Sequence, residues 1–389
     1  MKLTHLLAAG LLSASSLLQA APQYSLTTLA PLADYPKGFA AALNNHGQIV
    51  GYSDLGEYSF KMAPTSWNNA IASAMRDGAG TYGMAFSIND HGEAVGVSYT
   101  SSGFYESTIG GLESIPPAHS YDGQATLWQN GTAITLPGLS GQFAQAKGIN
   151  HHGQVVGWSV NASNQTIATL WNNQTPTALT SLDGYRGEAN AINDQGNTVG
   201  SLYSGFGSYA AFWNSNNELT LLSTIGGVGG EAYAINNNNL IAGWSASSDG
   251  RQHAALWENG TAIDLGNPDD YASFAYGMNN HDHVVGSFIG IDDTIGHDVE
   301  EYAALWIDGN RINLNSLIDG NAGILLNSAY GINDQGWIIA RGIDSNDTYH
   351  AYLLTPVPEP ATYALLLAGL GVLISNARRK TKIKTCNKQ

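Results

Sequence analysis

A four-residue turn recurs seven times along this 389-residue chain, and the repetition constrains the fold more than any other feature of the sequence. Each copy begins with Asn, lies between two short alternating runs, and has Gly, Asn or Asp as its fourth residue. Such runs on both sides of a turn predict a β-hairpin, and the fourth residue is expected to have a positive φ. The copies are residues 44–47, 89–92, 150–153, 193–196, 236–239, 279–282 and 333–336.

A second hairpin is predicted after each turn, because a run that ends in Trp is followed by a short turn such as Asn130-Gly131. Asn-Gly is the most favourable pair for a two-residue hairpin loop. Each repeat therefore has four short strands, and we expect the Trp to fill the gap between neighbouring sheets, opposite a Gly of the second strand. The tryptophans are Trp67, Trp128, Trp171, Trp213, Trp257 and Trp306, and the glycines are Gly51, Gly96, Gly157, Gly200, Gly243 and Gly286.

The two ends of the repeat array complement each other. Four strands in about 43 residues are typical of a β-propeller blade. The first strand, from Tyr24 to Leu32, has no partner in its own repeat, and the seventh repeat stops at Leu354 without a fourth strand. If these two segments pair, the ring closes and leaves no open sheet edge. The sequence predicts an all-β, seven-bladed propeller of four-stranded blades over residues 21–356, closed by the N-terminal strand. An open solenoid stack is the alternative.

Both chain ends look like export and sorting signals. Residues 1–20 have one early Lys, an apolar centre and small residues at the end, which is the layout of a secretory signal peptide. Val357-Pro358-Glu359-Pro360 is followed by an uncharged apolar segment at 361–377 and by Arg378-Arg379-Lys380. That segment is just long enough for one transmembrane helix. The basic tail at 381–389 is expected to stay in the cytoplasm and the propeller to lie outside.

Two resemblances follow from these motifs. The Pro-Glu-Pro box, the apolar span and the Arg pair, at residues 357–380, resemble the PEP-CTERM sorting signal of Gram-negative bacteria. This implies an exosortase as partner and a cell that exports exopolysaccharide. Residues 24–355 resemble the HAF family of extracellular repeats, with departures at residues 236–239 and at Leu354, which replaces Trp. The HAF resemblance implies no particular activity.

The charge of the chain argues against one class of partner. Residues 21–357 contain 8 basic and 30 acidic residues, so their formal charge is 8 − 30 = −22. A body of this sign has no basic patch for a phosphate backbone, which argues against nucleic acid. The single cysteine, Cys386, lies in the basic tail, so disulfides cannot stabilise the exported body.

The variable connections between the second and third strands are the candidate ligand face, because loops on a rigid frame often carry function. Aromatic rings beside carboxylates are typical of sugar-binding sites. The alternative is that these residues are ordinary polar residues of surface loops. The acidic run at 292–301 is a candidate Ca²⁺ site, but its spacing does not match an EF-hand, and a solvated loop is favoured. The candidate residues are Tyr105, Glu106, Tyr121, Asp292, Asp293 and Asp298.

Neither metal nor catalytic chemistry is predicted. His46, His91, His152 and His281 share one turn position, but we expect the turn tips to lie far apart and these side chains to be exposed. No familiar catalytic motif is present, although acids from different blades could still converge in the central funnel. We therefore expect an exported binding or structural module of the cell surface or exopolysaccharide matrix. The alternatives are a polysaccharide-active enzyme and a purely structural surface protein.

Overall fold

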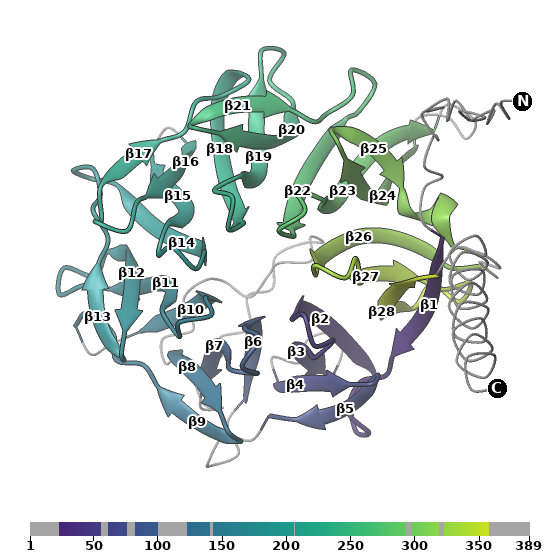
Figure 1. The fold of residues 1–389 in the computed structure, drawn as a ribbon, viewed down its shortest axis with the longest axis horizontal. Helices are drawn as coiled ribbons and strands as arrows, with labels where there is room; N and C mark the ends of the chain where they lie inside the picture. Colours follow the sequence, from purple (N-terminus) through teal and green to yellow (C-terminus); the bar gives the residue numbers. More distant parts are fainter. Residues whose placement is uncertain are drawn as a thin grey trace, which may run out of the picture. The chain divides into compact units, whose positions relative to one another are not determined.

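A computed structural model describes residues 23–357, apart from 56–60, 76–81, 100–122, 141–142, 206, 293–297 and 319–322. The chain divides into two units, one of which is Tyr24–Pro356 and the other the two chain ends, Met1–Gln23 and Val357–Gln389. Tyr24–Pro356 is a ring of seven antiparallel sheets of four strands each (Figure 1). The predicted seven-bladed propeller is therefore confirmed.

The first strand of each repeat lies nearest the axis and the fourth lies at the rim (Figure 1). We call these the inner and outer strands. Blade 1 contains β2 (Lys37–Leu43), β3 (Ile49–Asp54), β4 (Met62–Asn68) and β5 (Ile71–Ala74). Blade 2 contains β6 (Tyr82–Ile88), β7 (Ala94–Tyr99), β8 (Gln124–Gln129) and β9 (Thr132–Thr135). Blade 3 contains β10 (Ala144–Ile149), β11 (Val155–Val160), β12 (Thr166–Asn172) and β13 (Thr175–Ala178).

The remaining blades follow the same order. Blade 4 contains β14 (Arg186–Ile192), β15 (Thr198–Ser204), β16 (Gly207–Trp213) and β17 (Leu219–Leu221). Blade 5 contains β18 (Gly226–Ile235), β19 (Ile241–Ser247), β20 (Gln252–Glu258) and β21 (Thr261–Asp264). Blade 6 contains β22 (Ala272–Met278), β23 (Val284–Asp292), β24 (Asp298–Ile307) and β25 (Asn310–Asn313), followed by the 3-10 turn η1 (Leu314–Leu317). Blade 7 contains β26 (Leu325–Ile332), β27 (Ile338–Ile343), β28 (Tyr349–Pro356) and the N-terminal strand β1 (Tyr24–Leu29).

The N-terminal strand closes the ring as the sequence predicts. β1 pairs with β28 along its whole length, from Tyr24 opposite Pro356 to Leu29 opposite Ala351. Leu354, in the place of the repeat's Trp, is fully buried. Because this pairing supplies the outer strand that the seventh repeat lacks, the open stack is excluded.

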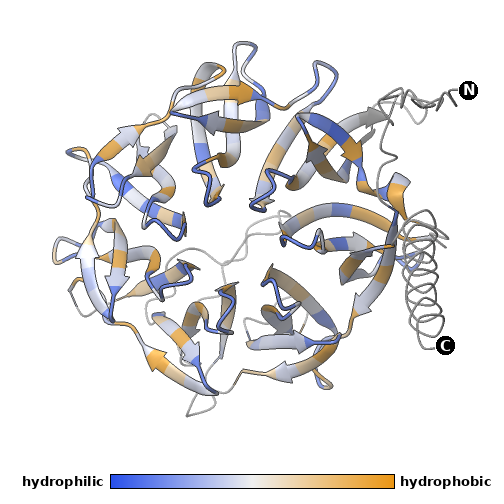
Figure 2. Cartoon of the chain, viewed as in Figure 1, coloured by the Kyte–Doolittle hydropathy of each residue, from blue (hydrophilic) through white to orange (hydrophobic). Residues whose placement is uncertain are grey.

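The two kinds of hairpin tip share one face of the ring, as expected from strand order. In blade 4, the backbone N–H of Ser215, in the second hairpin, donates to Oδ1 of Asn197, beside the first hairpin's turn, at 3.0 Å. All seven fourth turn residues have a positive φ, between 63° and 80°, which confirms the expectation. The inner turns are the hydrophilic ends of the blades (Figure 2).

The tryptophans join neighbouring blades, also as predicted. Trp213 in blade 4 is fully buried, and its Nε1 donates to the carbonyl oxygen of Thr180, just after the outer strand of blade 3, at 2.6 Å. Trp67, Trp171, Trp257 and Trp306 make the equivalent bond to the preceding blade, at 2.6–3.1 Å. A buried Trp adds a large apolar contact, and the indole bond satisfies its polar group.

The repeated glycine of the second strand lies against the inner strand of its own blade. Every inner strand contains a β-bulge, in which one residue has no cross-strand partner. A Cβ on Gly200 would lie 2.0 Å from the carbonyl oxygen of Glu188, and the five equivalent glycines are equally close to theirs. The glycine therefore makes room for the bulge, and not for the Trp. Blade 7 has Ala340 at this position.

Most of the two chain ends, where the sequence predicts export and sorting signals, lies outside the described residues. Val357 is half exposed, and its backbone N–H donates to the carbonyl oxygen of Gln23 at 2.8 Å. The signal peptide and the apolar segment at 361–377 lie outside the described residues. Within the described residues, no helix has the length and apolarity to cross a membrane.

Candidate functional site on the propeller axis

The first Asn of each turn links neighbouring blades around the axis. Asn193 is 3% exposed, and its Oδ1 accepts the backbone N–H groups of Gln195 in its own turn and of Asn197 directly after it. Its Nδ2 donates to the carbonyl oxygen of Asn236 in the next blade at 3.0 Å. The same bond joins every neighbouring pair of blades, at 3.0–3.2 Å, and returns from Asn333 to Asn44. We call this closed circle of seven bonds the turn ring.

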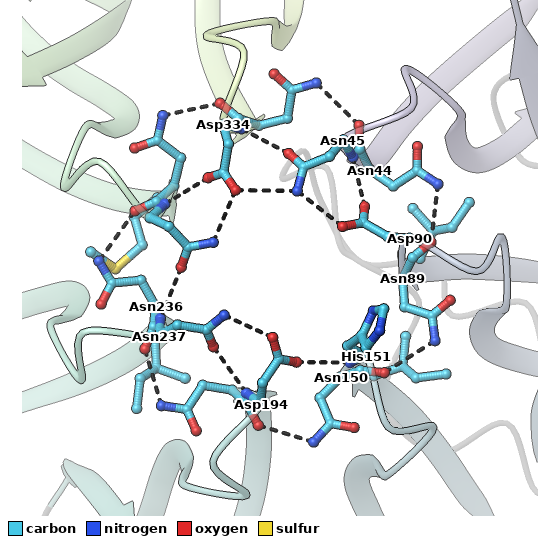
Figure 3. A pocket seen from close by; sticks show the side chains of 18 of the residues that line it. Asn44, Asn45, Asn89, Asp90, Asn150, His151, Asp194, Asn236, Asn237 and Asp334 are labelled. Carbon is cyan, nitrogen blue, oxygen red and sulfur yellow. Dashed lines mark hydrogen bonds between the residues drawn. The ribbon is translucent and has the colours of Figure 1, made fainter.

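The second turn residues form another circle with one gap (Figure 3). In six blades the backbone N–H of this residue donates to a side-chain oxygen of the equivalent residue in the next blade, at 2.8–3.0 Å. The gap lies between Asp90 and His151, because an imidazole has no oxygen to offer. The His151 ring instead lies 4.2 Å, between centroids, from that of His91. The residues are Asn45, Asp90, His151, Asp194, Asn237, Asn280 and Asp334.

These residues line a cavity of about 240 Å³ on the axis. Its three carboxylates already accept hydrogen bonds. Asp194, for example, accepts from the His151 N–H at 2.9 Å and from Asn237 Nδ2 at 2.7 Å. No group of three or more His, Cys, Asp or Glu suited to a metal occurs among the described residues. The hydrogen bonds of this circle join neighbouring blades.

The expectation that the turn tips lie far apart is wrong, because the tips contact one another around the axis. The hydrogen-bonded residues are the first and second of each turn. His46, His91, His152 and His281, at the third position, are exposed as predicted.

The bulges place a second set of side chains around the axis, on the inner strands three residues before each turn. We call the seven unpaired residues and their neighbours two positions earlier the axial layer. By strand geometry the bulge residue lies roughly 10 Å along the strand from the turn ring. The bulge residues are Ala41, Phe86, Lys147, Asn190, Tyr233, Tyr276 and Tyr330, and the earlier neighbours are Phe39, Met84, Gln145, Glu188, Glu231, Phe274 and Ser328.

One half of the axial layer is aromatic. The rings of Tyr233 and Tyr276 have centroids 5.8 Å apart, and those of Tyr276 and Tyr330 are stacked at 5.5 Å. The series continues from Tyr330 to Phe39 at 4.8 Å. All four rings are half-buried, so each keeps some contact with solvent.

The other half of the axial layer is polar. Lys147 Nζ forms an ion pair with Glu188 and donates to Asn190 Oδ1 at 3.1 Å. The Lys147 and Glu188 side chains are 27% and 20% exposed. Next along the ring, the Tyr233 hydroxyl donates to Glu231 Oε2 at 3.1 Å. Three neighbouring blades thus bring one cation, two carboxyl groups and a phenol together.

Burial changes the titration of this half. Loss of hydration raises the pKa of the Glu231 carboxyl above its ordinary value, while bonds from Tyr233 and Ser208 and the Lys147 charge oppose that rise. Burial also raises the pKa of Tyr203, and the charges of Glu188 and Glu231 add to that rise, so both carboxyl groups act on one phenol. Glu231 therefore keeps its proton to a higher pH than an exposed glutamate does.

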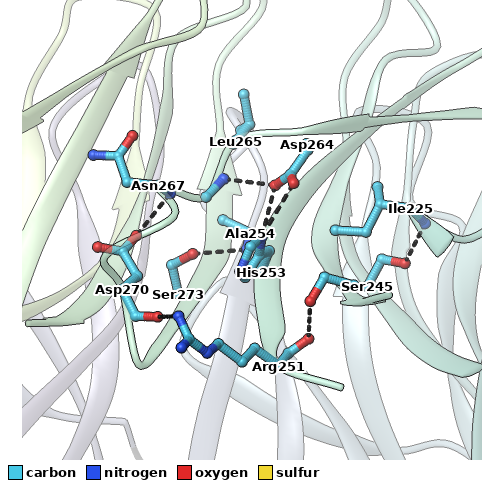
Figure 4. Close-up of polar contacts among 12 residues, drawn as sticks. Ile225, Ser245, Arg251, His253, Ala254, Asp264, Leu265, Asn267, Asp270 and Ser273 are labelled. Carbon is cyan, nitrogen blue, oxygen red and sulfur yellow. Dashed lines mark hydrogen bonds and ion pairs between the residues drawn. The ribbon is translucent and has the colours of Figure 1, made fainter. Parts of the chain in front are cut away.

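A third polar cluster holds blade 5 against blade 6 (Figure 4). Asp270 is 2% exposed, accepts the Asn267 N–H at 3.0 Å and forms an ion pair with Arg311. Arg251 donates to the Asp270 carbonyl oxygen at 3.0 Å. These bonds satisfy buried groups of the connection between the two blades, and we assign them a structural role.

The predicted ligand residues are mostly outside the described part of the chain. This applies to Tyr105, Glu106, Tyr121 and Asp293, and to Pro358, Glu359, Pro360, Arg378 and Arg379 of the sorting signal. The backbones of Asp292 and Asp298 pair at the ends of β23 and β24. Sequence reasoning missed the axial layer, although its residues stand at a fixed distance before each turn.

Comparison with known proteins identifies the C-terminal signal. Residues 356–380 match the PEP-CTERM protein-sorting motif, which indicates an exported protein that an exosortase processes. The motif implies delivery to the cell envelope or surface. No curated protein matches the chain.

Several solved structures are similar at low sequence identity. The β-propeller domain of the Trilobed protease from Pyrococcus furiosus has a TM-score of 0.46 and 8% identity, over 72% of this chain and 83% of that one. Virginiamycin B lyase from Staphylococcus aureus has a TM-score of 0.43 and 9% identity, over 86% and 100%. TolB from Acinetobacter baumannii has a TM-score of 0.38 and 10% identity, and the chain spans 60% of its length. The fold assignment rests on the strand pairing described above.

Proposed function

We propose that the exported propeller is a carbohydrate-binding module of the cell surface or exopolysaccharide matrix. The observation that supports this most strongly is the axial layer, where a series of aromatic rings adjoins carboxyl, amide and hydroxyl groups. Sugar rings stack on aromatic faces through their C–H groups, and their hydroxyls bond to such polar groups. A single face could serve both needs.

The loops that the sequence singled out would extend this site. The inner strands run from the face of the long connections toward the turn ring, so the axial layer lies on the loop side of that ring. We propose that Tyr105, Glu106 and Tyr121, with the acidic loop at Asp292, Asp293 and Asp298, add contacts to a bound chain. The proposal needs no cofactor, and Ca²⁺ would be an addition at the acidic loop.

Export and sorting complete the proposal. A signal peptide at 1–20 would direct secretion, the segment at 361–377 would hold the precursor in the membrane, and an exosortase would act near Pro358-Glu359-Pro360. We also propose that the seven units are HAF-type repeats, on the basis of their turn and Trp runs.

A glycan array probed with residues 21–356 tests the binding function. Tyr24–Pro356 forms a closed ring, so this segment is suited to the assay. We expect retention on a limited set of polysaccharides, and loss of retention in Tyr276→Ala, which interrupts the aromatic series. If the wild type binds no glycan, the purely structural alternative is favoured.

The enzymatic alternative has one observation in its favour. Glu188 is ion-paired, whereas burial raises the pKa of Glu231, and carboxyl groups with contrasting environments are the usual pair for glycoside cleavage. Shortening of a bound polysaccharide on incubation with the wild type, absent in Glu231→Gln, would establish it.

A further inference from the structure

We propose that the polar half of the axial layer, formed by Lys147, Glu188, Asn190, Glu231 and Tyr233, binds an amino sugar with a free amine. The inference rests on the proposed carbohydrate-binding function and names the class of sugar. It would distinguish polymers that carry ammonium groups from neutral, N-acetylated and acidic ones.

The polar half of the axial layer has more carboxyl groups than cationic groups, which favours binding of a cation. Lys147 forms its ion pair with Glu188, and its charge also acts on Glu231, so two carboxyl groups share one ammonium group. Glu231 has a hydrogen bond from Tyr233 but lies in a buried setting that disfavours its ionised form. A second ammonium group, supplied by a ligand, would give the second carboxyl group its own cationic partner and would favour the ionised form of Glu231.

The aromatic half provides a second contact of the same kind. Tyr233 belongs to both halves, because its hydroxyl bonds to Glu231 while its ring begins the series that continues to Tyr276 and Tyr330. Aromatic faces attract cations as well as sugar C–H groups. An aminated sugar stacked on this series would therefore place its ammonium group beside Glu231.

The charge of the whole body favours the same class. With a formal charge of −22 over residues 21–357, the propeller attracts polycations and repels acidic polysaccharides at low salt. Acidic polymers are therefore the least suitable ligands for this surface.

Calorimetric titration of residues 21–356 with oligosaccharides of equal length tests the proposal. The ligands are β-1,4-linked oligomers of glucosamine, of N-acetylglucosamine and of glucose, together with spermidine, at mildly acidic pH. We expect the glucosamine oligomer to bind at least about tenfold more tightly than the other three. Equal affinity for a neutral oligomer would overturn the amine assignment and leave carbohydrate binding in place. If none of the oligomers binds, the amino-sugar assignment fails, and the glycan array decides separately whether the propeller binds another carbohydrate.

Spermidine separates the amine from the sugar, because it carries ammonium groups without a sugar ring. Binding as tight as that of the glucosamine oligomer would overturn the assignment of an amino sugar. Weak or undetectable binding of spermidine supports it.

Two variants with opposite expected effects on amine binding keep the test independent of folding defects. Glu231→Gln removes one carboxylate and should abolish the preference for the amine. Lys147→Met releases Glu188 from its ion pair and should strengthen amine binding severalfold. Glu258→Gln, with the same chemical change at an exposed site in β20, is the matched control and should bind as the wild type does. An unchanged preference in Glu231→Gln, or weaker binding in Lys147→Met, contradicts the proposal.

Discussion

The turn ring and the axial layer lie on the same seven inner strands, yet they differ in how strictly the fold chooses their residues. The first turn position is Asn in all seven blades. The bulge position, three residues earlier, holds Ala, Phe, Lys and Asn once each and Tyr three times. Each of these positions has the same backbone conformation from blade to blade. The difference in sequence therefore shows which side chain the closed ring requires and at which position the ring tolerates several side chains.

The reason for uniformity is the number of bonds that each Asn makes. Its oxygen caps two N–H groups of its own turn while its amide nitrogen reaches the next blade. No other side chain of this size offers both an acceptor and a donor in that arrangement. The bulge positions share no such bond, although Asn190 Nδ2 donates to the Ala232 carbonyl oxygen at 2.8 Å, so the residue type there is freer to serve a ligand. The following changes test that contrast.

The largest effect is expected at the glycine that makes room for the bulge in six of the seven blades. In Gly200→Ala the new Cβ would lie 2.0 Å from the Glu188 carbonyl oxygen, and the backbone must shift to admit it. We expect a loss of about 4 kcal/mol in the free energy of unfolding, at the upper end for one substitution. Denaturant unfolding measures it, with Gly205→Ala, where no atom lies within 4 Å of the added Cβ, as control. A loss below about 1 kcal/mol would show that the bulge yields easily.

The next effect concerns the turn ring. Asn193→Ala leaves two turn N–H groups and the Asn236 carbonyl oxygen without their side-chain partner at a buried site. We expect a loss of about 3 kcal/mol, because each buried polar group left unsatisfied costs roughly 1–3 kcal/mol. The same denaturant assay checks this, in comparison with Gln195→Ala, which removes an exposed side chain that donates to the Asn237 carbonyl oxygen at 2.8 Å. Equal stability of the two variants would mean that water replaces the Asn.

A pH-dependent effect is expected in the axial layer. Burial raises the pKa of Glu231 in the folded state above 4.5, the ordinary value for a glutamate. Between the two pKa values the folded protein holds a proton that the unfolded chain has lost, so this residue's contribution to stability falls as pH rises. The stability of the wild type relative to Glu231→Gln should therefore decrease from pH 4.5 upward. A constant or rising difference across that range argues against a raised pKa of Glu231 in the folded state.

The smallest effect repairs the gap in the second circle. His151→Asn would give the Asp90 N–H the side-chain oxygen that six other blades supply. We expect a gain of about 0.5–1 kcal/mol, as for one ordinary hydrogen bond. Thermal unfolding detects such a gain, and a decrease in stability would mean that the contact between His91 and His151 is worth more than the missing bond.

Much of the ring could be predicted because its signals are local or periodic. Turn residues gave the hairpins and their positive φ values, and the complementary chain ends gave the pairing of β1 with β28. The bonds between Asn193 and Asn236 could not be predicted, because they depend on how closely seven tips converge on one axis. In the sequence, the bulge is marked only by Gly200 and the equivalent glycines of five other blades. From the sequence alone, these glycines indicate space for a Trp.

A ligand-induced shift of the melting temperature compares the two regions in one assay. Residues 21–356 would be heated with and without the glucosamine oligomer, as wild type, as Asn193→Ala and as Glu231→Gln. We assign stability to the turn ring and ligand binding to the axial layer. We therefore expect that Asn193→Ala melts at a lower temperature but keeps the ligand-induced rise. Glu231→Gln should melt near the wild type at mildly acidic pH and lose that rise. The opposite pattern, with the rise lost in Asn193→Ala and kept in Glu231→Gln, would contradict the division.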